Sequence, residues 1–204
     1  MIIRYPTPEN LLNTIEHDAL DLPLSEFIAY KHFLKYFADT EGDLTLHHCV
    51  IGASVVYSWM PTQLKRIDEA SITKSLPFLN KAKKGGDLTK EEIETVRLCV
   101  NGGSMVGASK LLHCICPAKY PIWDSNVYWG IHRQKPSDTA MKSVAQYMDY
   151  MKHSREMSEM KETGKLVEHF GKQVEPLRAY ELAIYLTGKK MMEENRAMEK
   201  SQKN

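Results

Sequence analysis

The spacing of apolar residues constrains the fold of this chain more than any other sequence feature. Apolar side chains recur at helical intervals along most of its 204 residues, whereas alternating segments joined by hairpin turns are hard to find. The sequence therefore predicts an all-α fold. Between Leu24 and Phe37, for example, apolar residues fall on one side of an amphipathic helix, at Phe27, Ile28, Leu34 and Phe37.

The same periodicity predicts several further helices. They are expected over 44–59, 62–81, 90–100, from the end of a glycine-rich turn to about 116, and over 124–133, 137–170 and 175–200. Segment 44–59 is almost wholly apolar in its second half, so we expect it to be a central, buried helix. Pro77 is expected to break helix 62–81, and Gly171 and Pro176 separate the last two segments.

One helix boundary is defined by a specific motif. Thr89 is followed three residues later by Glu92, the pattern of a capping box, in which each side chain accepts a hydrogen bond from the other residue's backbone N–H. The motif predicts that a helix begins at Lys90.

Composition places the chain among ordinary globular proteins. Hydrophobic residues make up 43% and charged residues 26% of the sequence. We expect one all-α domain over residues 1–187 and a charged C-terminal tail, residues 188–204, that frays. No apolar run approaches the roughly 18 residues needed to cross a bilayer, and MIIRYPTPEN does not have the pattern of a signal peptide. These features predict a cytoplasmic protein with no membrane association.

The cysteines do not predict a metal site. Cys49, Cys99, Cys114 and Cys116 lack the spacing of zinc or iron–sulfur ligands. We therefore expect thiols in a reducing compartment and no metal or other cofactor.

Charge is distributed unevenly along a nearly neutral chain. The net charge is +1, but residues 1–73 hold ten acidic and five basic side chains, while residues 74–204 hold 16 acidic and 22 basic ones. A basic portion suits an acidic partner such as nucleic acid, although a solvated surface of mixed charge is an equally common explanation.

Residues 101–133 are the most informative segment. In the expected helix ending near Cys116, one apolar stripe leaves Lys110 facing away from the core. A turn of small residues precedes Lys110, and such a turn can direct several backbone N–H groups at a phosphate. The residues expected to contact DNA there are Gly102, Gly103, Gly107 and Ser109.

This segment resembles the helix-hairpin-helix DNA glycosylase superfamily. In that family a glycine-containing hairpin leads to a helix that carries a lysine in some members, and a proline-containing loop then precedes an aspartate. The resemblance implies two helical lobes, an active-site element at about 85–135, and DNA carrying a damaged or modified base as the partner, with the protein associated with the nucleoid. The matching positions are Lys110, Pro121, Asp124, Ser125, Val127 and Arg133.

The sequence departs from the family pattern at several places, and the interval of 14 positions from Lys110 to Asp124 is short for the family. Gly107 lies one position out of phase with Lys110, Asn126 stands where the family has histidine, and Trp129 stands where it has arginine. No cysteine cluster follows, which excludes the iron–sulfur branch of the family.

The chemistry of base excision assigns a role to each matched residue. The enzyme must flip a nucleotide out of the duplex and stabilise positive charge that develops on the sugar. Asp124 is expected to stabilise that charge or to accept a proton, and the Lys110 amine to attack as nucleophile and form a Schiff base. Arg133 is expected to contact DNA, and Trp123 and Tyr128 to line the base pocket.

Simpler explanations exist for the same residues. Asp124 can be an ordinary helix N-cap, and Lys110 can be a solvated lysine on the helix surface. His113 can be a packed or an exposed histidine, and Trp123 and Tyr128 can be core side chains. A catalytically silent module for binding nucleic acid or protein is therefore the alternative to the enzyme. A third possibility is an enzyme on this scaffold that acts on unusual bases.

Overall fold

The computed structural model describes residues 5–18, 24–58, 67–100 and 102–201. Over these ranges the regular structure is helical. The β-structure there is one isolated antiparallel β-bridge, between Ile67 and Val100. The predicted all-α fold is confirmed. No helix within the described ranges combines the length and the apolar character needed to span a membrane.

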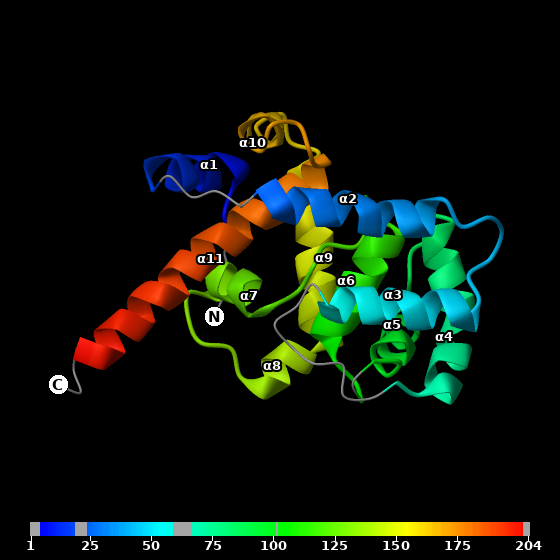
Figure 1. The fold of residues 1–204 in the computed structure, drawn as a ribbon. Helices are drawn as coiled ribbons and strands as arrows, with labels where there is room; N and C mark the ends of the chain where they lie inside the picture. Colours follow the sequence, from blue (N-terminus) through cyan, green and yellow to red (C-terminus); the bar gives the residue numbers. More distant parts are fainter. Residues whose placement is uncertain (1–4, 19–23, 59–66, 101, 202–204) are drawn as a thin grey trace. The chain divides into compact units, whose positions relative to one another are not determined.

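The helices form two compact units (Figure 1). The first, called the α6 unit, contains α2 (Leu24–Ala38), α3 (Leu46–Ser58), α4 (Glu69–Lys83), α5 (Lys90–Arg97) and α6 (Met105–Ile115). The second, called the α11 unit, contains α1 (Pro8–His17), α7 (Ser125–His132), α10 (Thr163–His169) and α11 (Pro176–Ser201). The short α8 (Asp138–Lys142) lies mainly in the α11 unit, and α9 (Val144–Ser158) contributes residues to both.

Helix α6 is the core of its unit. It contacts α2, α3, α4 and α5, and all of its residues except Val106 and Lys110 are buried. The sequence predicts that segment 44–59 is the central, buried helix. This prediction is wrong, because α3, the helix of that segment, buries only one side, which includes Cys49, Ala53 and Val56. The close approach expected at Gly52 is present, since a Cβ there would overlap the Phe37 ring.

Helix α4 continues through its proline. Pro77 cannot donate the hydrogen bond that the Thr73 carbonyl would accept, yet the helix extends to Lys83, so the predicted break is wrong. The packing explains the difference, because the buried residues Ile72 and Leu79 hold both sides of the proline against the core, while Pro77 itself is exposed.

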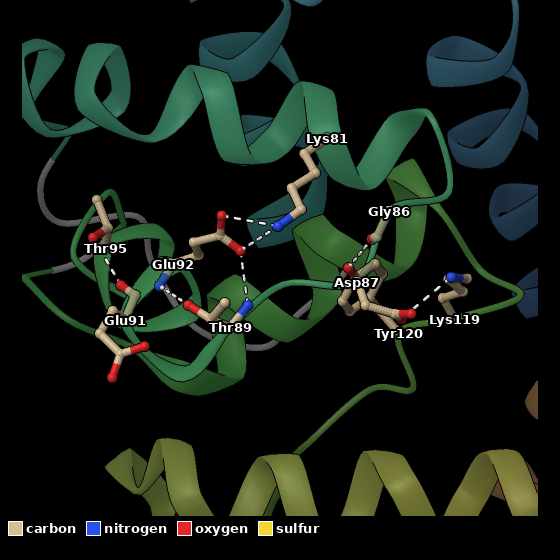
Figure 2. Close-up of polar contacts among 9 residues, drawn as sticks. All are labelled: Lys81, Gly86, Asp87, Thr89, Glu91, Glu92, Thr95, Lys119 and Tyr120. Atoms are coloured by element: carbon tan, nitrogen blue, oxygen red, sulfur yellow. Dashed lines mark hydrogen bonds and ion pairs between the residues drawn. The ribbon is translucent and has the colours of Figure 1, made fainter.

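The predicted capping box is present at the start of α5. Glu92 Oε2 accepts from the Thr89 N–H at 2.7 Å, and Thr89 Oγ1 accepts from the Glu92 N–H at 3.3 Å. Figure 2 shows that the Lys81 ammonium also reaches this carboxylate, at 2.8 and 3.0 Å. The Glu92 carboxylate therefore binds both Lys81 of α4 and the Thr89 N–H at the start of α5, and the bond to Lys81 joins the two helices.

Helix α1 was not expected from the sequence, although its start carries a recognisable signal. The Thr7 side chain accepts from the Asn10 N–H, and Pro8 occupies the first helical position. The buried residues Leu11, Leu12 and Ile15 then face the α11 unit's interior.

The α11 unit depends on close contact between two helix backbones. A Cβ at Gly188 of α11 would overlap the Asn126 carbonyl of α7, and a Cβ at Gly130 of α7 would overlap the Ile184 carbonyl of α11. Each glycine therefore lies against a backbone carbonyl of the partner helix, an approach that any larger residue would prevent.

The residues expected to form a fraying tail continue α11. The helix runs without interruption to Ser201, and Gly188 at the start of the expected tail is buried. Lys190 pairs with Asp18 at 2.5 Å, and this contact lowers the pKa of the Asp18 carboxyl and raises that of the Lys190 ammonium. The contact fixes this part of α11 to the residue that follows α1.

Substitution of Gly188 by alanine tests the close helix contact. We expect Gly188→Ala to lower the free energy of unfolding by about 1–3 kcal/mol or more, because the methyl group must displace α7 from α11. Gly164→Ala is the matched control: Gly164 is also helical, in the same unit, and a Cβ there meets no atom within 4 Å. Urea unfolding of both variants measures the difference, and equal stabilities would contradict the contact.

Candidate functional site

The glycine-rich turn between α5 and α6 is shorter than expected. Gly102 and Gly103 have φ of +64° and +107°, a region that favours glycine, and Ser104 then caps α6 by accepting from the Gly107 N–H at 3.1 Å. The helix therefore begins at Met105, which corrects the prediction that the turn extends to Ser109.

Arg97, at the end of α5, holds this turn. Its Nη1 donates to the Gly103 carbonyl at 2.6 Å, and its Nε and Nη2 donate to the Glu94 carboxylate, which lowers the pKa of Glu94. A Cβ at Gly103 would lie 2.6 Å from Nη1, so the glycine makes room for the guanidinium. This role cannot be predicted from the sequence, because the Glu94–Arg97 spacing indicates an ion pair but does not indicate a bond to Gly103.

Two residues expected to contact DNA lie inside α6. Gly107 is buried against the Tyr57 ring, and Ser109 is fully buried, with its hydroxyl donating to the Val106 carbonyl at 3.0 Å. The helix-start N–H groups of Met105 and Val106 have no hydrogen-bond acceptor among the described residues. Those two groups are therefore the ones that the helix start can offer to an anion.

Asp124 caps α7, as the simpler explanation predicts. Its Oδ1 accepts from the backbone N–H groups of Asn126 and Val127, both at 2.9 Å. Its Oδ2 takes part in no hydrogen bond or ion pair with any described residue, and the side chain is half-buried. One carboxylate oxygen is thus fixed by the helix while the other is uncommitted.

The other residues matched to the glycosylase pattern are distributed over both units. Lys110 is half-buried on α6 and belongs to the α6 unit, whereas Asp124 belongs to the α11 unit, so their pairing stays a prediction. Arg133 is exposed at the C-terminal end of α7, with a left-handed φ of +54°. Its contact with DNA also stays a prediction.

Trp123 and Tyr128 are buried. Trp123 has 0% of its surface exposed, and its ring meets that of Tyr128 edge to face, with centroids 5.8 Å apart. Tyr128 also stacks on His132, at 4.1 Å between centroids. This burial is what a core role predicts, and a base pocket formed by the two residues stays a prediction.

His113 is a packed histidine, as one of the two simple alternatives predicts. It is 0% exposed, and its ring bonds to the Tyr30 hydroxyl at 2.8 Å and to the Tyr120 carbonyl at 2.7 Å. Tyr30 and His113 are 83 positions apart in the sequence. No local sequence pattern relates residues at such a separation, so this contact cannot be predicted from the sequence.

The cysteines are free thiols, and two of them are poor nucleophiles. Burial raises the pKa of Cys49 to about 11 and that of Cys99 to about 12, which keeps both protonated at neutral pH. Among the residues that the structure describes, no three His, Cys, Asp or Glu side chains are grouped to hold a metal ion.

Comparisons of the chain with protein-family models, with curated proteins and with solved structures give no match.

The Glu92 contacts predict a specific dependence of stability on pH. Hydrogen bonding to Lys81 and to the Thr89 N–H lowers the Glu92 pKa from the ordinary value of 4.5. The resulting stabilisation is present above that value and is lost as the pH falls through the lowered folded-state pKa. We expect Glu92→Gln to be about 0.5–1 kcal/mol less stable than the parent at pH 7 and nearly equal to it at pH 3. Urea unfolding between these pH values measures the gap, and a constant gap would contradict the argument.

Proposed function

We propose that this protein is a DNA glycosylase-like enzyme that cleaves at the N-glycosidic bond of a flipped base. Asp124 carries the proposal, because the helix start fixes one of its oxygens and leaves the other uncommitted. In base release, the bonding electron pair leaves with the base, positive charge develops on the sugar, and water or an amine then bonds to the anomeric carbon. A fixed carboxylate beside that carbon stabilises the charge without reorganising.

The arrangement around Asp124 suits this role. The Asn126 and Val127 N–H groups at the start of α7 hold Oδ1 in place. The capping role and the catalytic role use different oxygens of the same side chain. Asp124 can therefore cap α7 throughout the reaction.

The hairpin between α5 and α6 supports DNA as the substrate. Two left-handed glycines and the Ser104 cap leave the N–H groups of Met105 and Val106 at the helix start, where they can bind a backbone phosphate. The hairpin also lies in the basic portion of the chain, residues 74–204.

Lys110 is the proposed nucleophile. Its amine would attack the anomeric carbon as the bond to the base breaks, and would lose a proton. The bond from the anomeric carbon to the ring oxygen then breaks, the oxygen takes up a proton, and the opened sugar is left as a Schiff base, from which strand cleavage by elimination can follow. Lys110 is half-buried on α6, six residues after the Ser104 cap.

A catalytically silent DNA- or protein-binding module is the second candidate function. The burial of Trp123 and Tyr128 favours it, because a base pocket needs aromatic faces that a flipped base can reach. The net charge of +1 favours it as well, since duplex-binding proteins usually concentrate positive charge.

Substitution of Asp124 by asparagine distinguishes the two candidates. Asparagine can still cap α7 but removes the charge, so we expect Asp124→Asn to keep its stability and to release base at least about 100-fold more slowly. The assay measures single-turnover base release from duplexes that contain uracil, an oxidised base or an alkylated base. Asp68→Asn is the matched control, because Asp68 caps α4 through the same kind of bond to the Ser71 N–H. No release by the parent from any duplex would favour the silent module.

Borohydride trapping on a duplex with an abasic site identifies the residue that acts as nucleophile. A Schiff base is reduced to a stable amine, so the parent should form a covalent adduct with DNA that Lys110→Arg cannot form. Lys119→Arg, in the loop after α6, is the control and should trap normally. Base release without any trapped adduct would assign the attack to water and leave Asp124 as the catalytic residue.

A charge placed at the start of α6 tests the phosphate contact. Val106→Glu adds an acid where a helix start favours one, so stability should stay within about 1 kcal/mol of the parent. The added charge would repel a phosphate, and we expect duplex affinity at low salt to fall at least about tenfold. Val106→Gln, of similar size, should bind like the parent. Equal binding by all three proteins would exclude a phosphate contact at this hairpin.

A further inference from the structure

Trp129 lies on the side of α7 that faces away from the core of the α11 unit. The residues that α7 buries are Val127, Tyr128, Gly130 and Ile131. Ser125 and Arg133, one turn before and one turn after Trp129, are both exposed, and Trp129 itself is half-buried. The indole ring makes no hydrogen bond or ring contact with any described residue. The helix therefore keeps part of a large aromatic side chain accessible.

Arg133 continues the same side of α7. It ends the helix with a φ of +54°, in the left-handed region that glycine usually occupies at a helix end. Its side chain is exposed and forms no ion pair or hydrogen bond with any described residue. Neither the backbone conformation nor an ion pair accounts for an arginine at this position, and its guanidinium can bind an anion.

An accessible aromatic ring and a guanidinium one turn apart suit a single strand of nucleic acid. A base stacks on the face of an aromatic ring, and a backbone phosphate binds a guanidinium. In duplex DNA the neighbouring bases cover both faces of each base, so a base must leave the stack before it can reach such a ring. The ligand that fits this side of α7 is therefore a strand with one base flipped out.

The position of Trp129 relative to Asp124 agrees with this ligand. Asp124 caps α7 five residues before Trp129, which is about 7.5 Å along the helix axis. Side chains on a helix lean toward its N-terminus, so the ring covers the first turn of α7, the turn that Asp124 caps. Asp124, Trp129 and Arg133 all belong to the α11 unit.

We propose that Trp129 stacks on the flipped base and that Arg133 binds a backbone phosphate of the same strand. The inference rests on the proposed function, because DNA with a flipped base must be the ligand. It supplies the accessible aromatic face that the buried Trp123 and Tyr128 do not offer.

A duplex with one unpaired adenine, compared with the fully paired duplex, tests the stacking. The unpaired base leaves the stack at little cost. We expect the parent to bind this duplex at least about fivefold more tightly than the paired one. Trp129→Leu should lose the preference, whereas Trp129→Phe, which keeps an aromatic ring, should retain most of it. A parent without the preference, or a folded Trp129→Leu variant that keeps it, would overturn the proposal.

Tryptophan fluorescence reports the same contact directly. Stacking on a base quenches indole emission, so the duplex with the unpaired adenine should quench the parent, and Trp129→Phe should lose that quench. Trp59→Phe removes a different tryptophan and should keep it. A quench that Trp129→Phe retains in full would come from another tryptophan and would contradict the stacking.

The salt dependence of binding tests Arg133. Each phosphate that the protein neutralises adds about 0.9 to the slope of log affinity against log salt concentration. We expect Arg133→Gln to reduce the magnitude of this slope by about one, and Trp129→Phe to leave it unchanged. Lys172→Gln is the matched control, because Lys172 is also basic, exposed and left-handed, with a φ of +58°, in the same unit. Equal slopes for Arg133→Gln and Lys172→Gln would overturn the role of Arg133.

Binding and base release together separate failure of this inference from failure of the proposed function. If the parent binds the unpaired base through Trp129 but releases no base from any duplex, this inference stands and the silent module replaces the enzyme. If the parent releases base and Trp129→Leu matches it in both affinity and rate, this inference fails while the proposed function stands.

Discussion

The contact between the backbones of α7 and α11 is the interaction on which the candidate site depends. Gly130 and Gly188 each lie against a carbonyl of the opposite helix, so the backbones of α7 and α11 are in close contact. Asp124 is the N-cap of α7, so the packing of α7 on α11 also places the Asp124 side chain. The carboxylate is therefore oriented by the packing of α7 on α11 and by its own bonds to the Asn126 and Val127 N–H groups.

Hydrogen bonds to backbone carbonyls organise the α6 unit in a comparable way. Arg97 binds the Gly103 carbonyl in the hairpin, and His113 binds the Tyr120 carbonyl in the following loop. Both carbonyls lie outside helices, where no backbone N–H is aligned to pair with them. The charged and aromatic donors supply these bonds and hold the hairpin, which the proposed function uses, and the loop after α6.

The sequence was sufficient for features that depend on near neighbours. The Thr89–Glu92 capping box and the Asp124 cap follow from residues two or three positions apart, and both are present. The Thr7–Pro8 signal of α1 is equally local and was available in the sequence. The continuity of α4 through Pro77 depends instead on packing against other helices, and the Tyr30–His113 bond joins residues 83 positions apart. Such contacts are properties of the assembled core, and periodicity or spacing carries no record of them.

The affinity of the protein for a cationic sugar analogue tests the central claim most directly, because it does not require the target base to be known. A duplex with a pyrrolidine in place of one deoxyribose carries a positive charge near the anomeric position, and a tetrahydrofuran analogue is neutral. We expect the protein to bind the cationic duplex at least about tenfold more tightly, equivalent to about 1.4 kcal/mol, and Asp124→Asn to abolish the preference. Equal affinities of the parent for the two duplexes would contradict the role of Asp124 in stabilising a charged sugar.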